Sequence, residues 1–252
     1  MLNPPLHRLD PLNRFSDRAS DYVKYRPSYP DTAIDAILSG LDHPIVADIG
    51  AGTGISSRLL GDRGLQVIAI EPNQAMSDAA EPHPNVQYQQ ATAERTELPD
   101  HSVDLVTCFQ AFHWFEPETT LNEFHRILKP NGRVALVWNN RDLSDPFTQD
   151  YGESLKQASN KHPALDRMIV SEPLFQHPQF QNARELVFPS EQALDYEGLL
   201  GSSNSRSYVP RSGAAYEQLL QDLERLYQQY ADQNGLVYMQ YHTKAIVAEV
   251  RS

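Results

Sequence analysis

Brief apolar runs alternate with longer amphipathic segments through the first half of the chain. Five such runs have the length and composition of buried strands, and they span Ile45–Ile49, Gln66–Ile70, Asn85–Gln89, Asp104–Phe109 and Arg133–Trp138. Between them apolar positions recur at helical spacing, as in the segment that Asp31 begins and that Gly40 is placed to end. This alternation predicts an α/β fold, in which helices cover a parallel sheet.

The pattern changes after Trp138, where polar loops and helices become longer. Strand signals are weaker there and lie near Glu185–Phe188 and Leu236–Val250. The segment Ala214–Tyr230 carries leucines and tyrosines at helical spacing, which predicts an amphipathic helix. The dipeptide Asn234-Gly235 then suits a turn into the last strand.

The length and charge of the chain limit the kinds of protein and of binding partner that the sequence is compatible with. With 252 residues it is long enough for one large α/β domain. Its formal charge of −12, from 33 acidic and 21 basic side chains, would repel nucleic acid or an anionic membrane surface. Cys108 is the only cysteine, so we expect no disulfide framework and no thiolate zinc site. The nine histidines are scattered and form no close constellation with carboxylates, so we expect no other metal site either. No segment has the pattern of a membrane span or a signal peptide, which favours a cytoplasmic protein.

The stretch VADIGAGTGISSRLL joins a predicted strand to a predicted helix through Gly50, Gly52 and Gly54. Glycine has no Cβ, so a ligand can approach the backbone closely at the carboxyl edge of a parallel sheet. A dinucleotide fingerprint would place its third glycine where Ile55 stands, which makes this loop a poor cradle for a pyrophosphate. Three glycines can also form a mere tight connection, but the acidic Asp48 before them weakens that alternative.

A second acidic residue, Glu71, follows the next predicted strand in the stretch IAIEPN. Because the carboxyl ends of parallel strands meet at one edge, we expect Glu71 beside the glycine loop. Its carboxylate can accept hydrogen bonds from both hydroxyls of a ribose. The loop and Glu71 together predict a site for a nucleoside that lacks a pyrophosphate.

Five stretches, DIGAGTG, IAIEPN, ATAERTELPDHSVDLV, QAFHWF and LKPNG, follow one another along the first half of the chain. On these stretches the chain resembles the class I S-adenosylmethionine-dependent methyltransferases, and among them the small-molecule methyltransferase type 11 group, which includes trans-aconitate methyltransferase-like proteins. The resemblance implies a Rossmann-like, doubly wound, seven-stranded sheet, mostly parallel with an antiparallel C-terminal strand. It also implies S-adenosyl-L-methionine as cofactor and a small-molecule methyl acceptor, with a carboxylate as one candidate. Residues 1–252 would form a single domain, with 1–30 as an N-terminal lid segment, 31–139 as the cofactor-binding core and 140–252 as the substrate-side cap and last strands.

The same resemblance implies roles for individual residues. Gly50 would lie under the methionine and ribose of the cofactor, and Glu71 would hold the ribose hydroxyls. Thr92 stands where many relatives have an acidic or amide side chain that bonds the exocyclic amine of adenine, so a hydroxyl leaves this contact open. Arg26 would pair with the methionine carboxylate beneath Tyr22, unless both belong to a solvated helix. The expected cofactor-binding residues are Tyr22, Arg26, Asp48, Gly50, Ala51, Gly52, Gly54, Glu71, Pro72, Thr92, Ala93, Glu94, Phe109 and Gln110.

His113 is the candidate catalytic base, because it follows the fourth predicted strand at the edge where donor and acceptor should meet. The alternative is a histidine that only orders its loop, and position alone favours that interpretation. Trp114 and Phe115 are spaced to pack against the helix that Pro117 begins. An amine or hydroxyl acceptor would need a base, whereas a carboxylate would need cations instead. The expected acceptor-side residues are His113, Trp114, Arg141, Arg206 and Tyr208.

Two other functions remain compatible with these motifs. A methyltransferase-like module could bind the cofactor without transferring a methyl group, and its acceptor pocket would then be closed. An NAD-dependent oxidoreductase is less favoured because of the glycine spacing. The sequence contains neither a G-x-S-x-G elbow nor a phosphate-binding P-loop. The acceptor and the oligomeric state stay open at this point.

Overall fold

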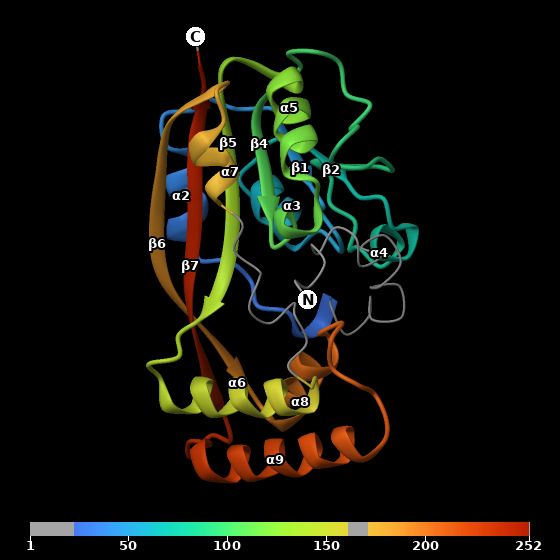
Figure 1. The fold of residues 1–252 in the computed structure, drawn as a ribbon, viewed down its shortest axis with the longest axis vertical. Coiled ribbons are helices and arrows are strands. Elements are labelled where there is room, and N and C mark those ends of the chain that lie inside the picture. Colours follow the sequence, from blue (N-terminus) through green and yellow to red (C-terminus); the bar gives the residue numbers. More distant parts are fainter. Residues whose placement is uncertain (1–22, 161–170, 252) are drawn as a thin grey trace, which may run out of the picture.

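The computed structural model describes residues 23–160 and 171–251, which build a seven-stranded sheet in the order β3-β2-β1-β4-β5-β7-β6 (Figure 1). The strands are β1 (Val46–Ile49), β2 (Val67–Ile70), β3 (Val86–Gln89), β4 (Val103–Phe109), β5 (Leu128–Arg141), β6 (Phe180–Leu194) and β7 (Val237–Val250). The first five pair in parallel, whereas β7 runs antiparallel to both of its neighbours. The predicted fold class is therefore confirmed, including the antiparallel last strand.

Two strands are longer than their sequence signals. β5 starts at Leu128 rather than Arg133, because Leu128 already pairs with Val103 of β4. Residues 129–132 then bulge out of this ladder, and Asn131 takes a positive φ of 64°. β6 extends far beyond the weak signal near Glu185–Phe188. It includes Pro189, which an edge strand tolerates because one side of its backbone needs no ladder partner.

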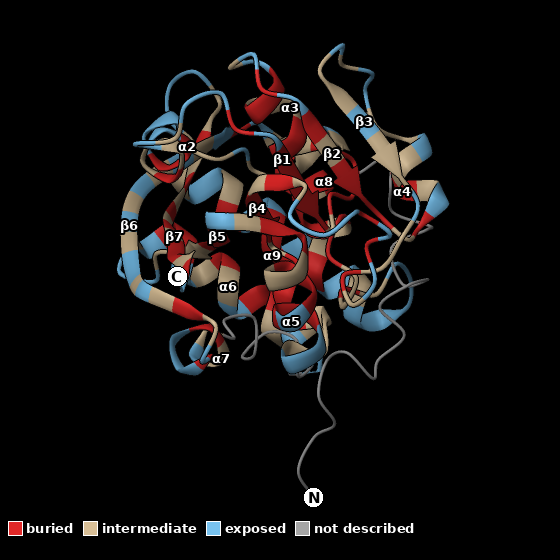
Figure 2. Cartoon of the chain, turned by 90° about the horizontal axis from the view of Figure 1, so that it is seen from above, coloured by how far each residue is buried: buried red, intermediate tan, exposed pale blue. Residues whose placement is uncertain are grey.

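Helices cover both faces of the sheet. They are α2 (Asp31–Leu38), α3 (Ile55–Gly61), α4 (Gln74–Asp78), η3 (Phe112–Trp114), α5 (Pro117–Ile127), α6 (Pro146–Ala158), α7 (Glu172–Gln176), α8 (Tyr196–Asn204) and α9 (Ala214–Tyr230). On one face α2 and α3 bury Ile34, Ile37 and Leu60, and on the other α5 buries Leu121 and Phe124. Figure 2 shows the result, with the central strands β1, β2 and β4 buried between the layers.

A cap of α6, α8 and α9 lies beyond the carboxyl ends of β4 and β5 (Figure 1). Its apolar core includes Phe147 and Tyr151 of α6, Leu223 of α9 and Met239 of β7. The predicted amphipathic helix matches α9 in its bounds. The cap thus closes the edge of the sheet at which the sequence places the candidate site.

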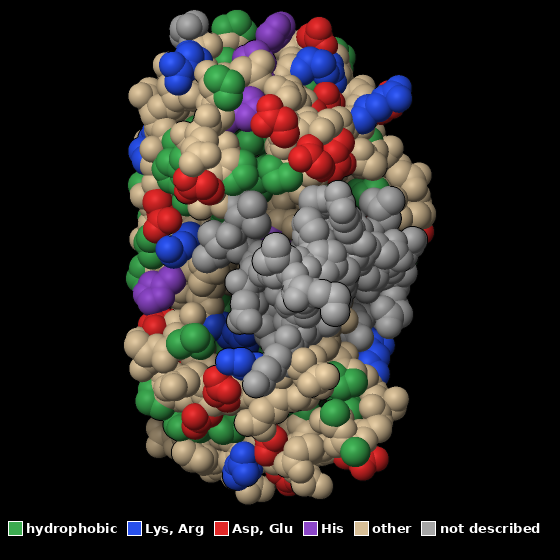
Figure 3. All heavy atoms as spheres, in the orientation of Figure 1, with side chains coloured by type: hydrophobic (Ala, Val, Ile, Leu, Met, Phe, Trp, Pro, Cys, Tyr) green, Lys and Arg blue, Asp and Glu red, His purple; other side chains and the backbone are tan. Residues whose placement is uncertain are grey.

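The outer surface is polar and mixed in charge. On the face seen in Figure 3, acidic and basic side chains outside the grey atoms form small scattered groups. Within residues 23–160 and 171–251, no helix has the length and apolar character that crossing a bilayer would require.

Candidate functional site

A cleft lies at the carboxyl ends of β1, β2 and β4. It holds about 720 Å³ of space that protein does not fill, a volume that includes its open mouth. Its lining residues are Gly50, Gly52, Glu71, Pro72, Asn73, Met76, Thr92, Ala93, Glu94, Phe109, Gln110, Ala111, Trp114 and Phe115. Most of the residues expected to bind a cofactor are thereby brought together in one place.

The glycine loop forms the floor of this cleft. The N–H groups of Gly50 and Ala51 donate to the carbonyl of Ile70 at 2.9 and 3.1 Å, which ties the loop to the end of β2. Gly50 has a φ of +70°, and a Cβ at this position would lie 2.6 Å from the Cβ of Ala111. Only glycine therefore fits here, because the conformation and the space both exclude a side chain.

Asp48 supports the loop from behind rather than lining the cleft. This fully buried carboxylate accepts hydrogen bonds from the hydroxyls of Ser56 at 2.7 Å, Ser57 at 2.6 Å and Thr107 at 2.8 Å. Burial raises its pKa, and the three hydroxyls oppose that shift. Gly54 likewise lies outside the lining and begins α3 in a left-handed conformation. Asp48, Ala51 and Gly54 do not line the cleft, so direct contact of these three residues with the cofactor stays a prediction.

Glu71 has a fixed orientation at the end of β2. Its Oε2 accepts from the N–H of Gly52 and its Oε1 from the N–H of Asn73, both at 2.8 Å. The side chain is 8 % exposed, and burial raises its pKa. Each carboxylate oxygen retains a further lone pair, which the hydroxyls of a ligand in the cleft can use.

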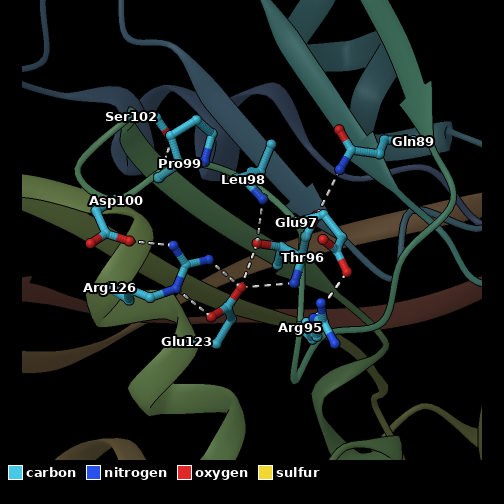
Figure 4. Close-up of polar contacts among 10 residues, drawn as sticks. All are labelled: Gln89, Arg95, Thr96, Glu97, Leu98, Pro99, Asp100, Ser102, Glu123 and Arg126. Atoms are coloured by element: carbon cyan, nitrogen blue, oxygen red, sulfur yellow. Dashed lines mark hydrogen bonds and ion pairs between the residues drawn. The ribbon is translucent and has the colours of Figure 1, made fainter.

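The loop after β3 is held by a buried polar network (Figure 4). Both the N–H and the hydroxyl of Thr96 donate to Glu123 Oε1, at 2.7 and 2.6 Å, and Arg126 donates to both oxygens of Glu123. Gln89 Nε2 donates to the carbonyl of Thr96 at 2.8 Å. Burial alone would raise the pKa of Glu123, but the hydrogen bonds from Arg126 and Thr96 lower it. The network thus clamps Thr96, which follows the cleft-lining residues Thr92, Ala93 and Glu94 in the same loop.

A second, smaller cavity adjoins the cleft. It is lined by Arg26, Pro27, Tyr29, Ile55, Gln110 and Asn139, and Gln110 borders both spaces. Gln110 Nε2 donates to the carbonyl of Asn139 at 3.0 Å, while its buried Oε1 accepts no hydrogen bond from any described residue. Arg26 also donates to the carbonyl of Ser205 at 3.3 Å. Arg26 therefore lines the smaller cavity, and its contact with a cofactor stays a prediction. Tyr22 lies outside the described residues.

His113 lies in η3 and is buried, with 5 % of its surface exposed. Its Nδ1 accepts a hydrogen bond from Trp138 Nε1 at 3.3 Å, which leaves the ring proton on Nε2. Burial, aided by the charge of Arg26, lowers its pKa to about 3. His113 is thus neutral near pH 7, and these contacts favour its role in ordering the loop. Its predicted role as a base stays a prediction.

Trp114 and Phe115 line the cleft as well as pack against neighbouring residues. The ring of Phe115 does pack edge-on against Phe112, with centroids 6.3 Å apart, which anchors it near α5. Both residues also line the cleft, and Phe115 lies 2.9 Å from the place where a Cβ of Gly50 would stand. The helix-stapling interpretation therefore covered only part of their contacts.

The predicted acceptor-side arginines converge on one ring in the cap. The guanidinium carbon of Arg141 lies 5.7 Å and that of Arg206 5.8 Å from the centroid of the Tyr151 ring. Arg206 Nη1 donates to the hydroxyl of Tyr208 at 3.5 Å. Burial would raise the pKa of Tyr151, but the charge of Arg206 and the hydroxyls of Ser202 and Ser203 lower it. These residues form a cationic, phenolic cluster at the end of β5, and their contact with an acceptor stays a prediction.

Sequence reasoning missed several residues of the site. Met76 and Ala111 line the cleft, Glu123 clamps its wall and Tyr151 joins the two arginines. Ala111 could have been found, because it follows Gln110 directly at the end of a predicted strand. The others occupy ordinary helical positions, and the sequence contains no signal that separates them from core or surface residues.

Comparison with known proteins agrees with this geometry. A family model described as a methyltransferase domain matches residues 47–136. An uncharacterized methyltransferase-like protein of Schizosaccharomyces pombe is 34% identical over 203 residues, which is 79% of each chain. An uncharacterized methyltransferase of Mycobacterium tuberculosis is 37% identical over 167 residues, 66% of this chain and 68% of that protein. A solved structure from Anaeromyxobacter dehalogenans, described provisionally as a type II methyltransferase, has a TM-score of 0.64 at 22% identity and covers 90% of this chain and 98% of that one. The chain belongs to the class I S-adenosylmethionine-dependent methyltransferases.

Proposed function

We propose that the cleft binds S-adenosyl-L-methionine and that the protein transfers its methyl group to a small acceptor, of which a carboxylic acid is favoured. The orientation of Glu71 carries this proposal. Its carboxylate is held by Gly52 and Asn73 at the end of β2, where it can accept hydrogen bonds from ribose hydroxyls above the glycine loop. The bound cofactor supplies an activated methyl group, so the protein has to align the reactants and exclude water.

The smaller cavity fits the amino-acid part of this cofactor. Arg26 offers a guanidinium for a carboxylate, and Gln110 offers a buried oxygen that lacks a donor among the described residues. A zwitterionic group would pair with both at once. Tyr29, which lines this cavity, packs against the core residue Phe109, with their ring centroids 4.6 Å apart.

The state of His113 supports an acceptor that needs no base. A histidine with a pKa near 3 is a weak proton acceptor, and a carboxylate has no proton to lose at neutral pH. Arg141 and Arg206 would then attract and hold the anionic acceptor near the cap. The buried Cys108 fits a reducing compartment, so we place the reaction in the cytoplasm.

Ligand-induced thermal stabilisation tests the cofactor assignment. S-adenosylhomocysteine should raise the unfolding temperature progressively as its concentration increases, because a ligand that binds only the folded state stabilises it by RT ln(1 + [L]/Kd). NAD should leave the unfolding temperature unchanged. Stabilisation by NAD alone would instead indicate the oxidoreductase alternative.

Turnover with a methyl-labelled cofactor then tests the transfer. Pools of small carboxylic acids, amines and phenols should give label incorporation with the carboxylic acids. Incorporation only into amines or phenols would show that a base operates and would overturn the favoured acceptor class. Cofactor binding without turnover in any pool would favour the binding module.

A further inference from the structure

Asn139 lies near the end of β5, and both ends of its side-chain amide are hydrogen-bonded. Its Nδ2 donates to the carbonyl of Ser28 at 2.9 Å, and its Oδ1 accepts from the hydroxyl of Thr243 at 2.6 Å. A backbone carbonyl only accepts hydrogen bonds, so the amide nitrogen must face Ser28 and the amide oxygen must face Thr243. Asn139 is therefore a buried polar group with one permitted orientation, and it lines the smaller cavity.

The partner of Asn139 on the next strand is itself fixed. Thr243 is fully buried in β7 and stands opposite Asn139 in the register of β5 and β7. Its hydroxyl donates its one proton to Asn139, so the hydroxyl of Ser190 in β6, 3.1 Å away, must donate to Thr243 in turn. Three neighbouring strands of one sheet thus set the orientation of the amide.

The carbonyl of Ser28 belongs to the entry segment, residues 23–30, which leads into α2 (Figure 1). Arg26 and Tyr29 of this segment line the smaller cavity, and Ser28 lies between them in the chain. The amide of Asn139 therefore holds the entry segment at the point where that segment forms the wall of the cavity.

Other contacts of the entry segment go to the cap and to β6. Gln192 Nε2 donates to the carbonyl of Tyr25 at 3.0 Å, and Lys24 Nζ lies 2.7 Å from Glu197 Oε1. Both side chains of this ion pair are mostly exposed, and such pairs contribute little to stability. Asn139 differs from these contacts, because it joins the segment to the strand next to β4, at the edge that carries the cleft.

The main chain of Asn139 orients a group on the other side of the same cavity. Its carbonyl accepts from Gln110 Nε2 at 3.0 Å, and Gln110 takes a positive φ of 53° at the end of β4. Because the amide nitrogen of Gln110 is held in this way, its buried Oε1 remains as an acceptor for a ligand. One residue thus orients polar groups from two separate parts of the chain.

We propose that Asn139 is a positioning residue for the amino-acid part of the cofactor. Its amide holds the entry segment, and with it Arg26 and Tyr29, against the smaller cavity, while its carbonyl orients Gln110. The proposal rests on the proposed function, because it deepens the same site. The amino-acid part is charged and has several rotatable bonds, so a preformed cavity lowers the free-energy cost of ordering both partners on binding.

Isothermal titration of Asn139→Ala with two ligands tests the proposal. S-adenosylhomocysteine carries the amino-acid part, whereas 5′-methylthioadenosine lacks it and keeps the adenosine and the sulfur. The variant retains the main-chain carbonyl that holds Gln110, so the substitution isolates the hold of the amide on Ser28. The affinity for S-adenosylhomocysteine should fall about five- to tenfold, the usual effect of one neutral hydrogen bond, and that for 5′-methylthioadenosine should change less than about twofold.

Asn140→Ala is the matched control, because it makes the same change one residue further along β5. The side chain of Asn140 points to the opposite face of the sheet, and its Nδ2 has no hydrogen-bond partner among the described residues. This variant should bind both ligands as the wild type does. Thr243→Val keeps the side-chain volume and removes the donor that orients the amide, so it should lower the ratio of the two affinities about twofold or more even if Asn139→Ala fails to fold.

Limited trypsin digestion of the ligand-free proteins separates positioning from direct contact with the ligand. Cleavage after Lys24 requires the entry segment to leave its place, so Asn139→Ala should release the fragment that begins at Tyr25 about fivefold faster than the wild type and Asn140→Ala do. A lower affinity ratio without faster cleavage would indicate direct contact and would overturn the proposal.

Three results of the titrations would also overturn it: an unchanged affinity ratio in Asn139→Ala and Thr243→Val, an equal loss for both ligands, or the same selective loss in Asn140→Ala. Because both ligands are titrated into one protein sample, a partly unfolded variant does not distort the ratio. If the folded wild type binds neither ligand, the proposed function fails and this proposal fails with it.

Discussion

The substitution Gly50→Ala probes the floor of the cleft. Gly50 has a φ of +70°, and an added Cβ would lie 2.6 Å from the Cβ of Ala111 and 2.9 Å from Cζ of Phe115. The left-handed conformation costs a residue with a Cβ about 1–2 kcal/mol. Forcing a methyl group into filled space costs a further 1–3 kcal/mol or so. Because the Cβ of Ala111 cannot rotate away from its own backbone, we expect a loss of about 2–5 kcal/mol in the free energy of unfolding.

Two further variants separate these costs. Gly64 has a φ of +79°, but a Cβ there would meet no atom within 4 Å. Gly64→Ala should therefore show the conformational cost alone, about 1–2 kcal/mol. The double variant Gly50→Ala/Ala111→Gly removes the closest contact and should regain stability relative to Gly50→Ala.

Urea unfolding of the ligand-free proteins gives these free energies, and calorimetric titration gives their affinity for S-adenosylhomocysteine. Gly64→Ala should bind normally. Gly50→Ala should lose about tenfold or more in affinity, because Ala111 and Phe115 line the cleft and must shift. Equal stability of Gly50→Ala and Gly64→Ala, or no recovery in the double variant, would refute the steric reasoning.

Three other substitutions test the remaining parts of the site. Glu71→Ala should weaken S-adenosylhomocysteine binding by about 1–3 kcal/mol in titration calorimetry. A 2′-deoxy analogue of this ligand should bind the wild type more weakly than S-adenosylhomocysteine does, whereas the variant should not distinguish the two ligands. Unchanged binding by the variant would remove Glu71 from the site. Thr96→Val should lower the free energy of unfolding in urea by about 1.5–3 kcal/mol, because Glu123 loses a buried hydrogen-bond donor. Thr119 is exposed, so Thr119→Val should stay within about 0.5 kcal/mol of the wild type. Similar losses in both variants would contradict the role of Thr96 in holding the loop. His113 has its pKa lowered from 6.5 to about 3, so the unfolded chain binds more protons in that range and stability falls as the pH falls. Between pH 7 and pH 5 the wild type should lose about 2 kcal/mol more than His113→Asn, which cannot titrate; parallel pH profiles would show that His113 is not held neutral.

Much of the sheet and of the cofactor side could be predicted because their signals are local. A strand buried between two helical layers is mostly apolar, so β1, β2 and β4 stand out in the sequence although β1 carries Asp48 and β4 carries Thr107. The glycine loop requires positive φ angles, and only glycine adopts these at no cost. Glu71 could be placed beside that loop because parallel strands end at a common edge.

The tertiary structure alone decided how distant residues meet. In the edge strand β6 half-buried and exposed positions alternate, but its residue types do not, so its length depends on pairing with β7 rather than on its own sequence pattern. Arg141 and Arg206 share the ring of Tyr151 only because the cap folds against the end of β5. The sequence could nominate His113 as a base, but its protonation follows from burial, and burial is a property of the packed fold. The sequence by itself thus determined which chemical groups stand at the ends of the strands, whereas packing decided their distances, their solvation and hence their chemistry.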